Sequence, residues 1–215
     1  MKTPGSATRP TAERFLAAAE SVFIRCGYEG AAIRLIAAEA GAHLSAFHHY
    51  WGSKEALFRQ VCERRFGPVQ LRQLERLHEC EAALAAGLAL DVRTLVLALI
   101  EPAILAGGGA AERETTRLFY GRALLEPAPA FMQIMRRVVY DTSALFNALM
   151  RHACPALDAE TFYWRFNCAL GAIIVSHSYG ERVAQFFDQR RRQPDWARVI
   201  DEIAGFVAAG MQRPA

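Results

Sequence analysis

The chain has 215 residues, of which 53 % are hydrophobic and 22 % charged, so it is a folded globular protein rather than a disordered one. No hydrophobic run reaches about 18 residues, and the segment 1–11 lacks the apolar stretch of a signal peptide. We therefore expect a cytoplasmic protein without a membrane span. The net charge of +3 lies wholly in residues 1–66, which hold nine Lys/Arg and six Asp/Glu, as a basic contact with phosphates requires.

Cysteine usage agrees with a reducing compartment. The five cysteines are scattered, odd in number and free of any Cys-x-x-Cys pair. We predict reduced thiols, most of them buried, and no disulfide framework. The residues in question are Cys26, Cys62, Cys80, Cys154 and Cys168.

The first elements in chain order are an arm and a helix. Residues 1–10 are rich in Pro, Gly, Ser and Thr, and we expect a flexible arm. A helix is predicted over 11–26, with an apolar stripe at helical spacing and Gly27 at its end. The stripe consists of Phe15, Ala18, Ala19, Val22 and Phe23.

Two short helices follow on a tight turn. Apolar residues recur at helical spacing over 32–40, and Gly41 follows where a left-handed C-terminal cap is wanted. A second short helix is predicted over 44–50. Ser53 can then cap a third helix. This arrangement is typical of a helix-turn-helix, in which the second helix enters the DNA major groove.

Residues 11–66 resemble the DNA-binding domain of the TetR family of bacterial regulators. The matching stretches are RFLAAAESVFIRCGYEG (14–30), IRLIAAEAG (33–41) and FHHYWGSKEALF (47–58). The resemblance rests on the order and spacing of these motifs across the whole domain, rather than on any single motif. It implies a DNA-binding domain over 11–55 and an effector-binding, dimerisation domain over 56–215.

The candidate DNA contacts lie on and around the second short helix. Phe47 and Trp51 should pack inward, which turns the rest of the helix to the groove. The resemblance adds Arg34, and Lys54 as a phosphate-binding lysine. The full candidate set is Arg34, His43, Leu44, Ser45, Ala46, His48, His49, Tyr50 and Lys54. The three histidines are not at i, i+4 spacing, so a metal site is the weaker interpretation.

The chain departs from the family at the start of the first short helix. Family members usually carry a Thr or Ser pair that caps this helix and contacts phosphate, whereas this chain has Ala31 and Ala32. Losing such a cap costs about 1 kcal/mol. Arg34 then matters more for DNA binding. A TetR-like protein that has lost DNA binding is an open alternative.

The rest of the chain predicts helices only, giving an all-α fold of about nine helices. A long helix over 53–81 carries an apolar set, and Gly67-Pro68 should kink it. That set is Leu57, Phe58, Val61, Phe66, Leu71, Leu74 and Leu77. Asp91 and Asp158 should cap later helices. The later helices are predicted over 91–105, 111–125, 130–152, 159–187 and 195–210.

The last two helices, about 159–187 and 195–211, are the expected homodimer interface, because the family pairs them as a four-helix bundle. A two-fold pairing sets two reading helices about 34–36 Å apart. Between the earlier helices we expect an apolar pocket with a few polar groups for a small apolar effector. Its candidate lining is Phe119, Tyr120, Arg122, Met135, Phe146, Trp164 and His177.

Several later stretches are similar to the fatty-acid-responsive PsrA branch of the family. They are IRLIAAEAG, GSKEALFRQVCERRFGP, TFYWRFNCALGA (161–172) and FVAAGM (206–211). The resemblance implies a long-chain fatty acid or acyl-CoA as effector. The function predicted overall is a ligand-released repressor that binds double-stranded DNA as a homodimer, without cofactor or metal. The alternative from another class is a helical-bundle enzyme or metal-binding protein around Glu101, Arg122 and His177.

Overall fold

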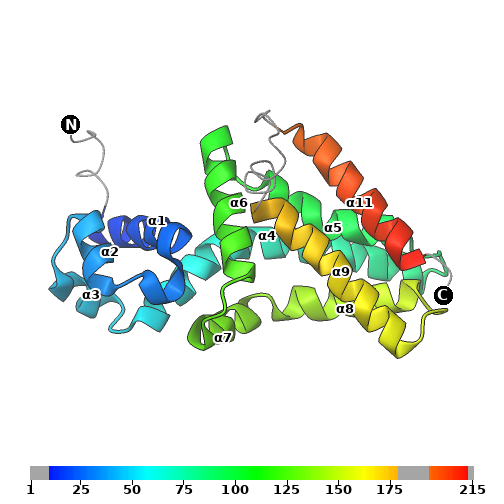
Figure 1. The fold of residues 1–215 in the computed structure, drawn as a ribbon, viewed down its shortest axis with the longest axis horizontal. Helices are drawn as coiled ribbons and strands as arrows, with labels where there is room; N and C mark the ends of the chain where they lie inside the picture. Colours follow the sequence, from blue (N-terminus) through cyan, green and yellow to red (C-terminus); the bar gives the residue numbers. More distant parts are fainter. Residues whose placement is uncertain (1–9, 179–193, 213–215) are drawn as a thin grey trace. The chain divides into compact units, whose positions relative to one another are not determined.

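The computed structural model describes residues 10–178 and 194–212, which form ten helices and no strand (Figure 1). The helices are α1 (Thr11–Gly30), α2 (Ile33–Ala40), α3 (Leu44–Tyr50), α4 (Lys54–Ala85), α5 (Val92–Leu105), α6 (Ala110–Leu124), α7 (Pro129–Val138), α8 (Tyr140–Ala153), α9 (Ala159–Ser178) and α11 (Trp196–Gln212). The all-α prediction is confirmed. Within these described ranges, no helix is both long and apolar enough to cross a membrane.

The chain forms two compact units. Unit 1 comprises residues 1–67 and 122–138, and unit 2 comprises residues 68–121 and 139–215. The units divide within α4, between Gly67 and Pro68, although helical structure runs through both residues. They divide again within α6, between Gly121 and Arg122. Unit 1 is thus larger than the predicted reading domain of 11–55 and includes a distant segment of the chain.

The core of unit 1 is aromatic. Phe15 and Phe23, on one stripe of α1, are fully buried, as their spacing predicted. Phe58 of α4 lies 5.6 Å from Phe23, ring centroid to centroid. Helix α1 ends its regular path at Gly27, where φ is 72° and ψ −178°, and resumes for one turn to Gly30. That region of backbone space is essentially open to glycine alone, which explains the predicted end at this residue.

The core of unit 2 is aliphatic and is centred on α5. This helix packs most extensively against α11 and also against α8. Leu95, Ile100 and Ile104 of α5 are fully buried, as expected of a helix that is apolar nearly all round. The predicted N-terminal caps are confirmed. Asp91 accepts a hydrogen bond from the Thr94 N–H at 3.1 Å, and Asp158 accepts from two backbone N–H groups at 2.9 Å.

Two details of the predicted helices are wrong. The stretch 130–152 is not one helix, because Val139 leaves the helical region and separates α7 from α8. Two consecutive β-branched residues, Val138 and Val139, are weak helix formers, and the chain passes from unit 1 to unit 2 there. Leu71, which was predicted to belong to the apolar face of the long helix, is 61 % exposed, whereas Gln73 is buried. The part of 159–187 beyond Ser178 lies outside the described residues.

Candidate nucleic-acid interface

The turn between α2 and α3 has the geometry that its glycine predicted. Gly41 is left-handed, with φ 59° and ψ 40°, and its N–H bonds back to the Ala38 carbonyl at 3.1 Å. Arg14 of α1 donates to the Ala40 and Gly41 carbonyls, each at 3.0 Å. A positive charge at these last carbonyls suits the negative end of the α2 dipole. Sequence reasoning missed this role of Arg14.

Helix α3 runs over Leu44–Tyr50, as predicted, with one face buried and the other open. Phe47 is buried and lies 6.4 Å from Phe15, centroid to centroid. Trp51 is 5.5 Å from Phe15 and donates through Nε1 to Gln60 Oε1 at 2.5 Å. These contacts fix the rotation of α3 about its axis. The predicted DNA-contacting residues of α3 and its cap are exposed, except that Ala46 is half-buried: His43, Leu44, Ser45, Ala46, His48, His49 and Tyr50.

An open hollow lies beside this exposed face. Its volume is about 420 Å³. The lining comes from the start of α1, the turn after α2, and α3: Thr11, Arg14, Gly41, Ala42, His43, Ser45, Ala46, His49 and Tyr50. Five of these were predicted DNA contacts from sequence. The hollow therefore gathers several hydrogen-bonding groups and one guanidinium on the side of unit 1 that presents α3.

The start of α2 has no side-chain cap. Ala32 stands at the cap position and supplies no side-chain hydrogen bond, while Ala31 is fully buried. Arg34, the second residue of α2, is exposed and has no carboxylate within 4.0 Å among the described residues. By contrast, Arg25 of α1 is held by Glu39 of α2. Arg34 is thus a free guanidinium next to an uncapped helix terminus.

Lys54, the first residue of α4, is held by the end of α1. Its ammonium lies 4.4 Å from the centroid of the Tyr28 ring and 3.4 Å from the Glu29 carbonyl oxygen. Partial burial lowers the pKa of Lys54, while the nearby carboxylates of Glu29 and Glu55 raise it. Ser53 caps α4 by accepting from the Ala56 N–H at 3.1 Å, as predicted. These contacts hold the side chain of Lys54 against the end of α1.

Unit 1 also contains a segment that sequence reasoning assigned to the effector domain. Phe131 of α7 is fully buried against Phe23, Tyr28 and Phe58, with centroid distances of 4.7, 5.5 and 6.2 Å. Glu126 is also buried and lies 3.4 Å from Arg122 Nε, beside Gly27. The sequence of residues 122–138 alone does not show whether their apolar face packs against α1 or against the helices of unit 2.

The predicted effector residues are distributed between the two units. Phe119, Tyr120 and Phe146 are buried in unit 2, and the Tyr120 hydroxyl accepts a hydrogen bond from Gln70 Nε2 at 3.4 Å. Arg122 and Met135 belong to unit 1 instead. The two remaining candidates are not in a described core. Trp164 is 60 % exposed on α9, and the side chain of His177 lies outside the described residues.

The described ranges contain no side-chain cluster that would support the alternative of a metal site. No group of three His, Cys, Asp or Glu side chains is close enough there to hold an ion. Glu101, one of the polar residues considered for chemistry, is paired with Arg76 of α4. Of the other two, Arg122 belongs to unit 1, and the side chain of His177 lies outside the described residues.

Two parts of the chain match known protein families. Residues 15–61 match the family of bacterial regulatory proteins of the tetR type, and residues 97–210 match the Tetracyclin repressor-like C-terminal domain. No curated protein matches the chain. Among solved structures, a tetR family transcription regulator from Shewanella sp. PV-4 is similar with a TM-score of 0.58 at 17 % identity, covering 94 % of this chain and 98 % of that one.

A second solved structure is similar over almost the whole chain. It is a transcriptional regulator from Rhodococcus sp. Rha1, with a TM-score of 0.53 at 18 % identity, covering 96 % of this chain and 100 % of that one. At such low identity these two likenesses support the fold alone. The match over residues 97–210 covers more than half of the sequence, and the match over residues 15–61 includes the helix-turn-helix described above. The chain belongs to the TetR family of DNA-binding transcriptional regulators, which are not enzymes.

Proposed function

We propose that the protein binds a palindromic operator as a homodimer and is released from it by a small apolar effector. In this account residues 11–55 read the DNA and residues 56–215 bind the effector and form the dimer. The predicted arm over 1–10 lies almost wholly outside the described residues. The observation that carries the proposal is α3. Its inner face is fixed by Phe47, while the neighbouring side chains are left open for a groove.

The chemistry of α3 supports readout of bases as well as of phosphates. Ser45 can donate to a phosphate or a base edge, and Leu44 and Ala46 can contact a thymine methyl group. Arg34 and Lys54 add positive charge on either side, which neutralises phosphates and makes binding dependent on salt. His49 and Tyr50 stand where the family usually places phosphate-contacting Tyr and His.

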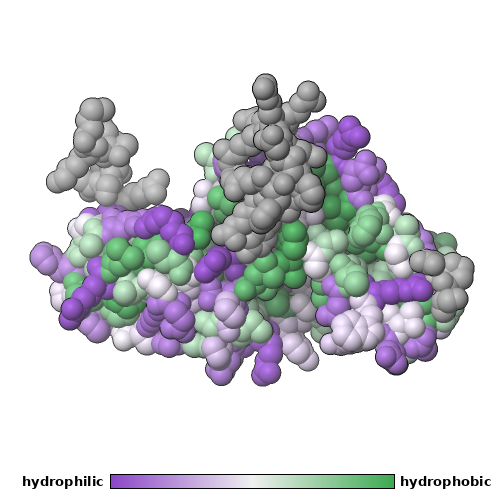
Figure 2. All heavy atoms as spheres, in the orientation of Figure 1, coloured by the Kyte–Doolittle hydropathy of each residue, from purple (hydrophilic) through white to green (hydrophobic). Residues whose placement is uncertain are grey.

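An exposed hydrophobic face on α9 and α11 supports the homodimer. Trp164 is 60 % exposed and Phe206 70 % exposed. Small residues, including Gly171 on α9 and Gly205 on α11, are exposed on the same two helices and leave space for close approach. Arg165 donates to the Met211 carbonyl at 3.5 Å and holds the two helices together. Green hydrophobic residues are visible along this part of unit 2 in Figure 2. Such a patch is typical of an interaction surface.

The effector step is proposed to act by a shift between two conformations. A ligand that binds unit 2 more tightly in one arrangement of the dimer favours that arrangement. The spacing of the two DNA-binding domains then no longer matches the spacing of the operator half-sites. DNA and effector must weaken each other by the same factor. The partial likeness to fatty-acid-responsive regulators supports an acyl chain as the apolar part of the effector.

Selection of bound duplexes from a random DNA pool tests the proposal. We expect an inverted repeat whose half-sites lie about 10 bp apart, centre to centre. Enrichment of no sequence at low ionic strength would instead favour a dimer that has lost DNA binding, a reading that the uncapped start of α2 at Ala32 supports. Titration of the selected complex with carboxylic acids and acyl-CoAs of different chain length then tests release.

A further inference from the structure

Unit 2 contains one buried arginine whose charge no acidic side chain balances. Arg117 of α6 is 9 % exposed, and no Asp or Glu lies within 4.0 Å of it in the described parts of the chain. By contrast, the shielded Arg65 is paired with Glu20 at 2.6 Å. A guanidinium removed from water without an anion is destabilising. Its retention inside this unit therefore needs a reason.

The surroundings of Arg117 leave its hydrogen-bonding capacity unused. Its contact is with the face of Trp196, at 4.0 Å from the guanidinium carbon to the ring centroid. An aromatic face attracts the cation but is not an acceptor for its five N–H groups. None of these groups has a hydrogen-bond acceptor among the described residues. Burial lowers the pKa of Arg117, with a smaller opposing effect of Glu114.

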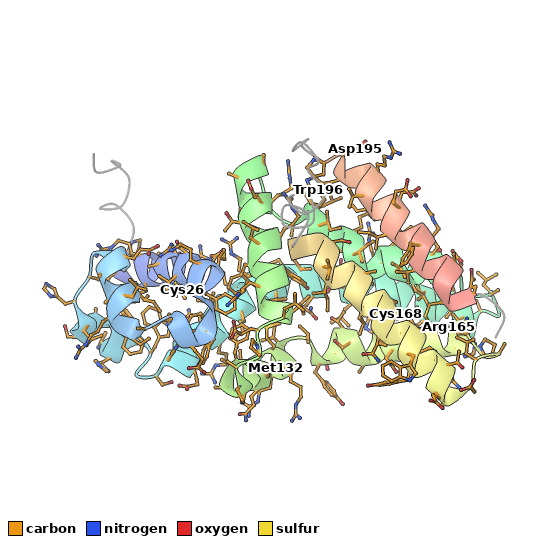
Figure 3. All side chains as sticks on the ribbon, in the orientation of Figure 1. Cys26, Met132, Arg165, Cys168, Asp195 and Trp196 are labelled. Atoms are coloured by element: carbon orange, nitrogen blue, oxygen red, sulfur yellow. The ribbon has the colours of Figure 1, made fainter. Side chains whose placement is uncertain are left out.

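The position of Trp196 gives this site an apolar side. Trp196 begins α11, where Figure 3 labels it beside Asp195, and it packs partly buried against the main core of unit 2. Val199, one turn later, packs on the same core. Asp195 itself caps α11 by accepting from the Ala197 N–H at 3.1 Å, so its carboxylate already serves the helix. The guanidinium thus faces the ring of Trp196, and no acid among the described residues is in contact with it.

We propose that Arg117 and Trp196 form the head-group site for an effector that carries a carboxylate on an apolar body. The fork of N–H donors of an arginine matches the two oxygens of a planar carboxylate, and such paired, charge-assisted bonds are strong where water is scarce. The apolar body then lies along the core side of Trp196. This inference rests on the proposed effector role of unit 2, and it specifies the charge that the effector carries.

Ligand binding to the free protein tests the site without DNA. Octanoate, decanoate, dodecanoate, benzoate and phenylacetate are titrated against the full chain by calorimetry and thermal shift, with decanol and benzyl alcohol as neutral counterparts. We expect at least one carboxylate to bind and its alcohol to bind about 10- to 100-fold more weakly, since a charged pair is lost. Binding by no carboxylate, or equal binding of acid and alcohol, overturns the proposal.

Variants separate a ligand site from a structural role. Arg117→Met should abolish the difference between carboxylate and alcohol and leave the unliganded protein at least as stable, because an unpaired buried charge is removed. Arg72→Met, at an exposed arginine of α4 in the same unit, should change neither. If Arg117→Met unfolds the unliganded protein, a carboxylate elsewhere in the chain pairs with Arg117 and the proposal fails. DNA selection with the parent chain would still succeed in that case, so the two failures are distinguishable.

Discussion

The rings of Phe23 and Phe131 stack, with centroids 4.7 Å apart and planes 25° apart. Phe23 lies in the middle of α1, whereas Phe131 lies more than one hundred residues later, on α7. The contact makes residues 122–138 part of unit 1, although the chain on both sides of this segment belongs to unit 2. The reading domain is therefore completed by a segment from the effector half.

Loss of this ring should destabilise unit 1. Phe131→Ala removes a fully buried aromatic side chain, for which about 3–5 kcal/mol is the usual loss in free energy of unfolding. Hydrogen exchange should then speed up in α1 and in the first turns of α4, as mass spectrometry would show. Met132→Ala is the matched control, because Met132 on the same helix is exposed (Figure 3). Unchanged protection of α1 in Phe131→Ala would contradict the assignment of α7 to unit 1.

Gly27 should tolerate no side chain. Its backbone conformation is open to glycine alone, and an added Cβ would lie 2.1 Å from Arg122 Nη2 and 2.7 Å from Glu126 Oε2. Gly27→Ala should therefore lower the free energy of unfolding by about 1–3 kcal/mol.

Gly67→Ala is the control for this substitution, since Gly67 is helical and open space surrounds it. It should change the free energy of unfolding by less than about 1 kcal/mol, because the better helix propensity of alanine is offset by the clash of its Cβ with the ring of Pro68. Urea denaturation of both variants checks the pair. Equal midpoints for Gly27→Ala and the parent would show that the backbone at residue 27 is free to relax.

Arg34 should carry one of the phosphate contacts. Arg34→Ala should weaken binding to all duplexes alike and reduce by about one the slope of log affinity against log salt. Arg59→Ala is the control, because Arg59 is an exposed arginine of α4 that faces Glu63 at 4.0 Å. Fluorescence anisotropy at several salt concentrations measures both. If Arg59→Ala changes the slope as much as Arg34→Ala, the charge acts through the overall field rather than through contact.

What the sequence predicts depends on how far apart in the chain the interacting residues lie. Local signals fixed α3, the cap at Gly41 and the caps at Asp91 and Asp158, because each depends on residues within a few positions of each other. The burial of Phe131 depends on partners far away in the chain, namely Phe23, Tyr28 and Phe58. For the same reason the predicted effector residues do not lie together. Any aromatic side chain on a helix can be buried, and the sequence does not show in which of the two units it is buried.

The ion pair of Arg25 and Glu39 predicts a dependence of stability on pH. The Arg25 side chain, which donates to Glu39, holds the pKa of that carboxyl below its ordinary value. A carboxyl with a lowered pKa in the folded state contributes stability above its unfolded pKa and loses it as pH falls through the folded value. The parent should therefore lose stability between about pH 5 and 3.

Removal of the partner should flatten this acid transition. Arg25→Met is expected to be less stable than the parent at pH 7 and closer to it at pH 3, because protonated Glu39 no longer gains from the guanidinium. Both residues are partly exposed, so the difference is small. Thermal denaturation of the two proteins across this range is the measurement. A constant gap in melting temperature would mean that the pair contributes nothing through charge.

Sedimentation equilibrium of the full chain, alone and with a duplex that carries the selected inverted repeat, tests the central claim most directly. The account predicts the mass of two chains in the absence of DNA and two chains on each duplex, with dissociation from DNA as salt is raised. A single chain in free solution, together with no association with any duplex at low ionic strength, would contradict it.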